Sequence, residues 1–212
     1  MKVCSWVVVS AALFVAASCS SSKPVDMSEP RRVVGTENDV RVDAEVIGDT
    51  LQTSTVISLK YDVTNNRAVP IAFADLVPET NYDPDTRTVT INLGSEVPGH
   101  ELLPRLVSIP PGGRKSFSAA AHVNIIVGES AATPLTRYPN ALQIKLNFLG
   151  DTKPFQELID IPERGVYNPK LADALFPTWL DRNEVVLTNS LPMRWQAPRE
   201  MLNPFPPRRR RP

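Results

Sequence analysis

Four acidic side chains fall within one short stretch of the chain, where carboxylates could bind a hard cation. They are Asp75, Glu79, Asp83 and Asp85. Carboxylate oxygens are the ligands that Ca²⁺ prefers, but an EF-hand loop starting at Asp83 would need glycine and glutamate where Thr88 and Gly94 stand. The sequence leaves two alternatives: a looser calcium site, or a turn at Asp83-Pro84-Asp85 whose side-chain oxygens accept hydrogen bonds from nearby amides.

The two histidines, His100 and His122, are the next candidates for a metal site. Catalytic zinc requires about three clustered protein ligands and one open position. The two residues lie far apart in the sequence, and His122 alternates with polar residues on the outer side of an expected strand. We therefore expect surface or loop histidines, with no metal and no cofactor.

The segment Gly128-Glu129-Ser130-Ala131-Ala132 follows an apolar strand and resembles the nucleophile elbow of α/β-hydrolases. The resemblance implies that Ser130 would be a catalytic nucleophile. Three features oppose it: Pro134 interrupts the helix that should follow, both histidines precede the serine, and the alternating strand–helix pattern of that fold is missing. No pair of carboxylates stands out for glycoside hydrolysis either. We expect a loop here and a protein that is not an enzyme.

The N-terminus has the features of an export signal. Lys2 precedes an apolar run that is too short to span a membrane and is followed by small residues. Ala16-Ala17-Ser18-Cys19 resembles the bacterial lipobox, although leucine is usual where Ala16 stands. The resemblance implies a signal peptide over residues 1–18 and a lipid on Cys19. The alternative is ordinary signal peptidase cleavage, because Ala16 and Ser18 also satisfy the small-x-small rule.

The lipobox resemblance also implies a location. Residue 20 is Ser20, whereas aspartate at this position is the familiar inner-membrane retention signal of such lipoproteins. We therefore expect an anchor in the outer membrane, with the protein facing the periplasm. Cys4 would leave with the signal peptide, so the mature chain would contain no disulfide. Residues 19–38 are rich in serine, proline and charge and are expected to form a flexible tether.

The chain carries 23 basic and 23 acidic side chains, but they are unevenly distributed. Four of the basic residues form one cluster near the C-terminus: Arg208, Arg209, Arg210 and Arg211. This cluster could bind an anionic surface, such as lipid headgroups, or it could be a solvated tail. Residues 198–212 are rich in proline and arginine and are expected to be disordered. Nucleic acid is not expected as a partner of an exported chain.

The body has apolar residues at every second position, which predicts strands with one buried face. Such segments cover residues 39–47, 54–63, 69–73, 89–93, 117–127 and 142–148, with turn residues between them. We expect an antiparallel sandwich of about seven to eight strands over residues 39–197. The pattern loosely resembles bacterial Ig-like and fibronectin type III domains, and the Pro-Pro-Gly-Gly turn at residues 110–113 contributes to that likeness.

One helix is expected near the C-terminus, over residues 168–182. Asn168 could be its N-cap with Pro169 at the first helical position, and Pro177 should end or kink it. A strand is expected over residues 184–188, and the alternation continues through Leu191 to Trp195. Aromatic residues gather here, namely Tyr167, Phe176, Trp179 and Trp195. They could form a binding surface or pack the helix onto the sandwich.

These observations lead to three functional hypotheses. The first is a membrane-tethered envelope lipoprotein that binds another envelope protein or supports assembly. The second is a glycan- or peptidoglycan-binding module, which would expose aromatics such as Trp179, Trp195 and Tyr82 on one face. The third, a hydrolase, requires Ser130 or a carboxylate pair in a cleft with a nearby base.

Overall fold

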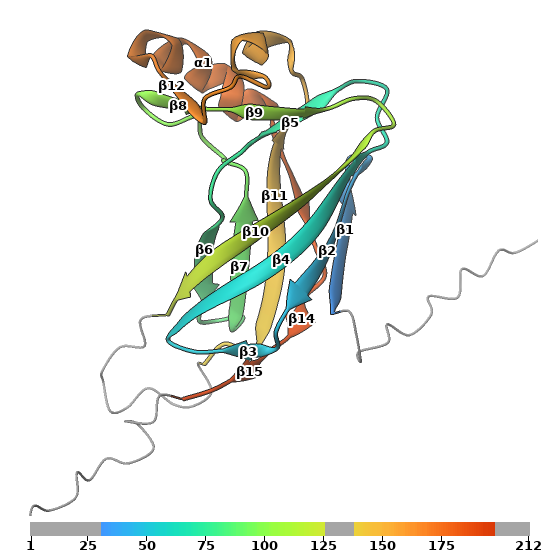
Figure 1. Cartoon of the computed structure of the whole chain (residues 1–212), viewed down its shortest axis with the longest axis vertical. Helices are drawn as coiled ribbons and strands as arrows, with labels where there is room; N and C mark the ends of the chain where they lie inside the picture. Colours follow the sequence, from blue (N-terminus) through green and yellow to red (C-terminus); the bar gives the residue numbers. More distant parts are fainter. Residues whose placement is uncertain (1–30, 126–137, 198–212) are drawn as a thin grey trace, which may run out of the picture.

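The computed structural model describes residues 31–125 and 138–197, which form a mostly β protein. Figure 1 shows an elongated body built of strands, with a smaller head of helices and short strands at one end. The mostly β class predicted from the alternating pattern is confirmed. Within these residues, no helix has the length and apolarity needed to cross a membrane.

The first sheet has four antiparallel strands in the order β1-β2-β4-β10. They are β1 (Arg32–Glu37), β2 (Val40–Ile47), β4 (Ser54–Asn65) and β10 (Arg114–Asn124). Every second residue of β2 is buried, from Val40 to Val46, as the period of two predicts. The residues between them lie on the outer face of the sheet.

The second sheet is larger, and its main path runs in the order β6-β7-β11-β5-β9. It consists of β6 (Glu79–Asp83), β7 (Thr88–Leu93), β11 (Ala141–Leu149), β5 (Ile71–Ala74) and β9 (Leu106–Ile109), with β13 (Asn183–Leu187) and β14 (Leu191–Pro192) also paired to β11. The prediction of purely antiparallel strands is wrong for β7 and β11, which run parallel. The chain visits the first sheet through β10 between them, so β11 returns in the direction of β7.

The main core lies between the inner faces of the two sheets. Val42 and Leu59 from the first sheet meet Ile91 and Ile144 from the second in one buried cluster. Hydrogen bonds also join the sheets at both edges. Thr80 Oγ1 of β6 donates to the carbonyl of His122 at 2.9 Å, and the amide of Val34 in β1 donates to Asn189 Oδ1 at 2.7 Å. The two sheets are therefore held together along both sides.

The head covers one end of the second sheet and has a core of its own. It contains β8 (Leu102–Pro104), the 3₁₀ segment η2 (Lys153–Leu158), β12 (Gly165–Tyr167) and α1 (Pro169–Arg182). Leu149 at the end of β11 packs with Phe155 and Trp179 in this second cluster. The head is thus fixed to the sheet by apolar contacts.

The predicted helix is confirmed as α1, with Asn168 Oδ1 accepting a hydrogen bond from the amide of Leu171 at 3.1 Å. Of the two effects predicted for Pro177, an end or a kink of the helix, the end is wrong, because α1 continues to Arg182. Proline removes one helical hydrogen bond. Trp179, which is fully buried one half-turn later, supplies packing that offsets this loss.

The predicted flexible tether over residues 19–38 is wrong at its C-terminal end. β1 pairs with β2 along its whole length, and Val33 is fully buried against the core. Signal residues 1–18, Cys19 and the rest of the tether to residue 30 lie outside the described residues.

A last pair of short strands, β3 (Thr50–Leu51) and β15 (Arg194–Trp195), runs parallel at the end of the body opposite the head.

Candidate functional site

No three of the four acidic side chains from Asp75 to Asp85 come together as metal ligands would. Asp83 accepts hydrogen bonds from the amide of Asp85 at 2.9 Å and from the hydroxyl of Thr86 at 2.7 Å. The bond from Thr86 is the main cause that lowers the pKa of Asp83. Asp75 forms an ion pair with Arg105. The turn at residues 83–85 is therefore confirmed, and two of the four carboxylates, those of Asp75 and Asp83, have partners other than a metal.

The two histidines lie apart and are exposed, His100 in the loop before β8 and His122 on the outer face of β10. Across residues 31–125 and 138–197, no three His, Cys, Asp or Glu side chains come together as metal ligands would. Ser130 and its flanking motif lie outside the described residues, as do Cys19 and the cluster from Arg208 to Arg211.

Trp179, Trp195 and Tyr82 do not form one exposed platform, whereas Tyr167 on β12 and Phe176 on α1 are exposed. Trp179 is fully buried, and its indole Nε1 donates to the carbonyl of Ser95 at 3.2 Å. Trp195 is half-buried and stacks on Tyr138 with ring centroids 5.0 Å apart. Tyr82 is half-buried on β6, in another part of the molecule. A glycan platform that includes Trp179 is therefore excluded, and this residue packs α1 against Leu149 at the end of the second sheet, in line with the alternative that the helix packs onto the sandwich.

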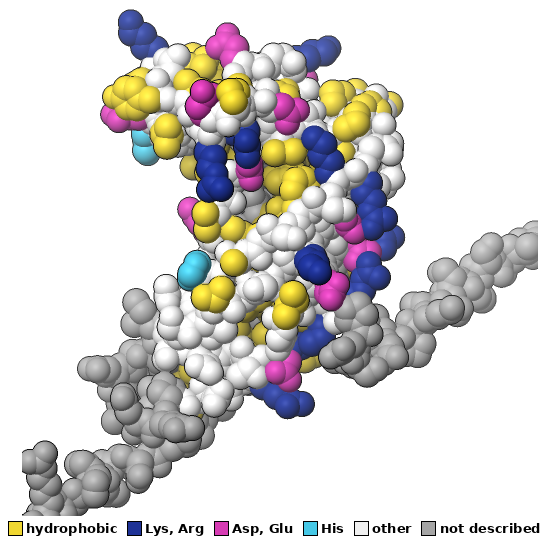
Figure 2. Space-filling view, in the orientation of Figure 1, with side chains coloured by type: hydrophobic (Ala, Val, Ile, Leu, Met, Phe, Trp, Pro, Cys, Tyr) yellow, Lys and Arg dark blue, Asp and Glu magenta, His cyan; other side chains and the backbone are white. Residues whose placement is uncertain are grey.

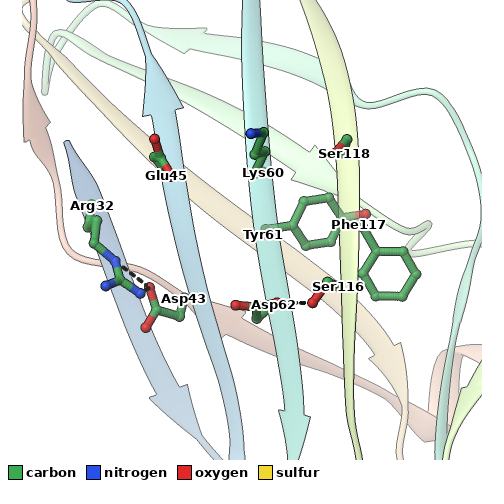
Figure 3. A pocket seen from close by; sticks show the side chains of 9 residues that line it. All are labelled: Arg32, Asp43, Glu45, Lys60, Tyr61, Asp62, Ser116, Phe117 and Ser118. Carbon is green, nitrogen blue, oxygen red and sulfur yellow. Dashed lines mark hydrogen bonds and ion pairs between the residues drawn. The ribbon is translucent and has the colours of Figure 1, made fainter. Parts of the chain in front are cut away.

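A shallow hollow of about 430 Å³ lies on the outer face of the first sheet (Figure 3). All four strands of the sheet contribute to it. Its lining consists of Arg32, Asp43, Glu45, Lys60, Tyr61, Asp62, Ser116, Phe117 and Ser118. We call the polar members of this set, together with Arg41 and Arg114 beside them, the charged face.

The strand register arranges the charged face in two rows. In one row Glu45 lies opposite Arg32 on one side and Lys60 on the other, so the charges alternate in sign. In the other row Asp43 lies opposite Asp62. Like charges directly opposite each other destabilise a sheet, so this second row requires cations nearby.

Arginines supply those cations. Arg32 donates to Asp43 from its Nη2 at 2.7 Å. Asp62 accepts from Arg114 and from the hydroxyl of Ser116. The hydrogen bond from Arg114 is the largest cause that lowers the pKa of Asp62 below its usual value, and the bond from Ser116 adds to it. Both carboxylates of this row therefore have cationic partners.

The arginines extend farther into solvent than the carboxylates they pair with. The side chain of Arg114 is 60% exposed and that of Asp62 is 21% exposed. Arg32 is 49% exposed, against 17% for Asp43. Figure 2 shows basic and acidic side chains along the right-hand side of the body, where β1, β2 and β4 lie. The outermost layer of these ion pairs is cationic.

Two aromatic rings lie beside the charged face across β4 and β10 (Figure 3). Tyr61 and Phe117 stack with centroids 5.1 Å apart, and Phe73 meets Phe117 edge-on at 5.2 Å. Burial raises the pKa of Tyr61, and the nearby charge of Asp75 adds to the effect, so the phenol stays neutral. The rings provide a rigid support for the strands that carry the charges.

The chemistry of the charged face suits binding better than proton transfer. Ser116 donates to Asp62, but Arg114 holds that carboxylate in its ionised form, which makes it a weak base. Fixed charges of both signs at set positions are the groups that orient a charged partner.

No family model, no curated protein and no solved structure matches this chain.

The charged face was not predicted from the sequence. Its signal was present in Arg41, Asp43 and Glu45, which alternate with the buried valines and alanine of β2. The two rows depend on which residues of neighbouring strands lie opposite each other, and a single sequence does not give that register.

Proposed function

We propose that this protein is a lipid-anchored, non-enzymatic binding module of the bacterial envelope. It holds another envelope protein against the charged face and so supports an assembly. The observation that carries the proposal is the open first sheet, whose outer surface presents ordered charges over a rigid core. An Ig-like arrangement of the two facing sheets is part of the proposal, since such sandwiches commonly present a sheet face or end loops to a partner.

The exposure of the arginines indicates the kind of partner. Arg32, Arg41 and Arg114 extend beyond the carboxylates that they neutralise. A partner with acidic groups can therefore meet guanidinium groups that are already oriented by Asp43 and Asp62. Ordered donors lose less side-chain entropy on binding than free ones. The proposed partner is a protein with an acidic patch.

The anchor contributes through local concentration. A lipid on Cys19 would confine the domain to the membrane surface, and the residues up to β1 would set its reach. The location at the outer membrane facing the periplasm is part of this proposal and depends on the residues around Cys19.

Metabolic labelling tests the anchor. Cells that express the full chain are grown with radioactive palmitate, and the protein is recovered and counted beside a Cys19→Ala variant. We expect label in the wild type and none in Cys19→Ala. Equal label in both proteins, or none in the wild type, would refute the lipid anchor.

Site-specific crosslinking tests the binding face. A photoreactive amino acid is placed at Ser118 on the charged face, or at Asp173, an exposed residue of α1 in the head, as the matched control. After irradiation of intact cells, we expect a discrete protein adduct from position 118 and none from position 173. Adducts of equal yield at both positions, or none at 118, would contradict the proposal.

A further inference from the structure

A second hollow, of about 440 Å³, lies on the outer face of the second sheet. We call it the amide groove, because four of its lining side chains are amides, namely Asn81, Asn92, Gln143 and Asn147, and Thr90 and Lys145 lie among them. Strands β6, β7 and β11 carry these residues, and residues 94–97 line it as well. The volume falls within the range of about 300–1,000 Å³ that is typical of small-molecule sites.

The register places the amides side by side. Thr90 of β7 lies opposite Asn81 on one neighbour and Gln143 on the other, and Gln143 Nε2 donates to the hydroxyl of Thr90 at 3.1 Å. Asn92 lies between Glu79 and Lys145. Asn81 and Asn92 make no side-chain hydrogen bond to another described residue, so their donors and acceptors are available to a ligand.

Asn147 is the residue that points to a ligand. It is only 4% exposed, and its Oδ1 is buried without a hydrogen-bond partner among residues 31–125 and 138–197. Its Nδ2 reaches the carbonyl of Leu93 at 3.5 Å, which is a long contact. A buried acceptor without a donor is costly and uncommon in proteins. A donor supplied from the groove would remove that cost.

The local backbone shows why Asn147 is enclosed. Gly94 adopts a φ of +72°, and a Cβ on this residue would lie 2.4 Å from the carbonyl oxygen of Asn147. The chain at residues 94–97 therefore packs directly against β11. One rim contact, between Lys145 Nζ and Glu96 Oε2 at 3.2 Å, involves a glutamate side chain that is 65% exposed. Exposed pairs of this kind contribute little, so the side chains of Lys145 and Glu96 can separate at small cost.

We propose that the amide groove binds an N-acetylated sugar of a glycan. An acetamido group has one N–H donor and one carbonyl acceptor. The N–H can donate to Oδ1 of Asn147, and the carbonyl can accept from the free amide of Asn92. The remaining amide and hydroxyl groups suit sugar hydroxyls. This inference is independent of the charged face, because the groove lies on the other sheet.

The groove also explains how a glycan could bind without the aromatic platform that the sequence suggested. Val97 and Leu187 are the apolar side chains of the groove, and none of its lining residues is aromatic. Recognition would therefore rest on hydrogen bonds rather than on ring stacking. Sites of this kind discriminate strongly against ligands that lack the required donor, because the buried acceptor then stays unpaired.

Titration of the full chain, labelled with ¹⁵N, tests the proposal by nuclear magnetic resonance. The probe is N,N′,N″-triacetylchitotriose, and cellotriose, which has hydroxyls but no acetamido groups, is the comparison. We expect saturable shifts of amide signals from β7 and β11 with the acetylated sugar at up to millimolar concentration. We expect at least about tenfold weaker binding of cellotriose.

Two variants separate binding from folding. Asn147→Ala should weaken binding at least about tenfold and leave the melting temperature unchanged or higher, because it removes the unpaired acceptor. Asn92→Ala, at the half-buried surface, should weaken binding while the protein stays folded. Asn124→Ala, on the outer face of the first sheet, should change neither sugar binding nor the melting temperature.

The contrary outcomes are distinct. Absence of saturable shifts, full affinity in Asn147→Ala or in Asn92→Ala, or equal binding of both sugars would overturn the proposal. A lower melting temperature of Asn147→Ala with unchanged binding by Asn92→Ala would show that Asn147 is structural. None of these results depends on whether a protein partner binds the charged face.

Discussion

Asp62 is the residue at which the charged face is most tightly organised. Arg114 and Ser116 both donate to its carboxylate from β10, and these bonds lower its pKa. In the unfolded chain the pKa returns to about 3.9. The carboxylate therefore stabilises the fold fully above that value, and this contribution is lost as the pH falls through the lower, folded-state pKa.

Replacing Asp62 by Asn should make this linkage visible. At pH 7 we expect Asp62→Asn to have a lower free energy of unfolding than the wild type, because Arg114 loses its partner. The difference should shrink as the pH is lowered below about 4, where the wild-type carboxylate also becomes protonated. Urea unfolding from pH 3 to pH 7 measures it. A difference that is the same at both ends of this range would rule out the assigned role.

At the scale of elements, the molecule depends on the seam between β1 and β13. The amide of Asn189 donates to the carbonyl of Val34 at 3.1 Å, and Asn189 Oδ1 accepts a hydrogen bond from the amide of Val34. Gly35 lies directly against this seam. A Cβ at Gly35 would lie 2.4 Å from the carbonyl oxygen of Leu187, so the close approach requires glycine.

Gly35→Ala should therefore weaken the seam. We expect a loss of about 1–3 kcal/mol in the free energy of unfolding, the usual cost of forcing an extra carbon into a packed site. Thr36→Ala, at the exposed next position of β1, should stay within about 0.5 kcal/mol of the wild type. Chemical denaturation of the three proteins gives the comparison, and a neutral Gly35→Ala would show that β1 is not held as described.

The elements that sequence predicts best are the long ones with strict alternation. Residues 39–47, 54–63 and 142–148 correspond to β2, β4 and β11, because one buried face dictates their pattern. β1 was mistaken for part of a tether, since Gly35 interrupts its apolar stripe. The short strands β8 and β12 contain too few residues for a period to show.

Other features depend on contacts between distant parts of the chain. The parallel pairing of β7 and β11, and the continuation of α1 through Pro177, follow from packing that no local pattern contains. The turn at Asp83 was predicted because its hydrogen bonds join residues within three positions of each other. The two rows of the charged face could not be predicted, since they combine residues from four strands.

For the whole molecule, the two sheets give the body two different outer faces. The first sheet presents ion pairs, and the second presents the amide groove beneath the head. The shared core holds both faces in fixed positions. We therefore expect binding on one face to be separable by mutation from binding on the other, because no strand contributes to both.

The central claim is that the charged face recognises an acidic partner through the fixed positions of its cations. Glu45 and Lys60 lie opposite each other on β2 and β4, so the exchange Glu45→Lys with Lys60→Glu keeps both the net charge and the opposite-sign pair. Because the exchange also places a lysine opposite Arg32, the free energy of unfolding should fall by about 0.2–1 kcal/mol, and the protein should stay folded. The order of charges from β1 through β2 to β4 changes from basic, acidic, basic to basic, basic, acidic.

The most direct measurement is the yield of the crosslinked adduct from position 118 in cells that carry this exchange. We expect that the adduct seen with the wild-type face is lost while the protein remains folded and equally abundant. An adduct of unchanged size and yield would contradict it, because the partner would then be insensitive to the charges that are proposed to bind it.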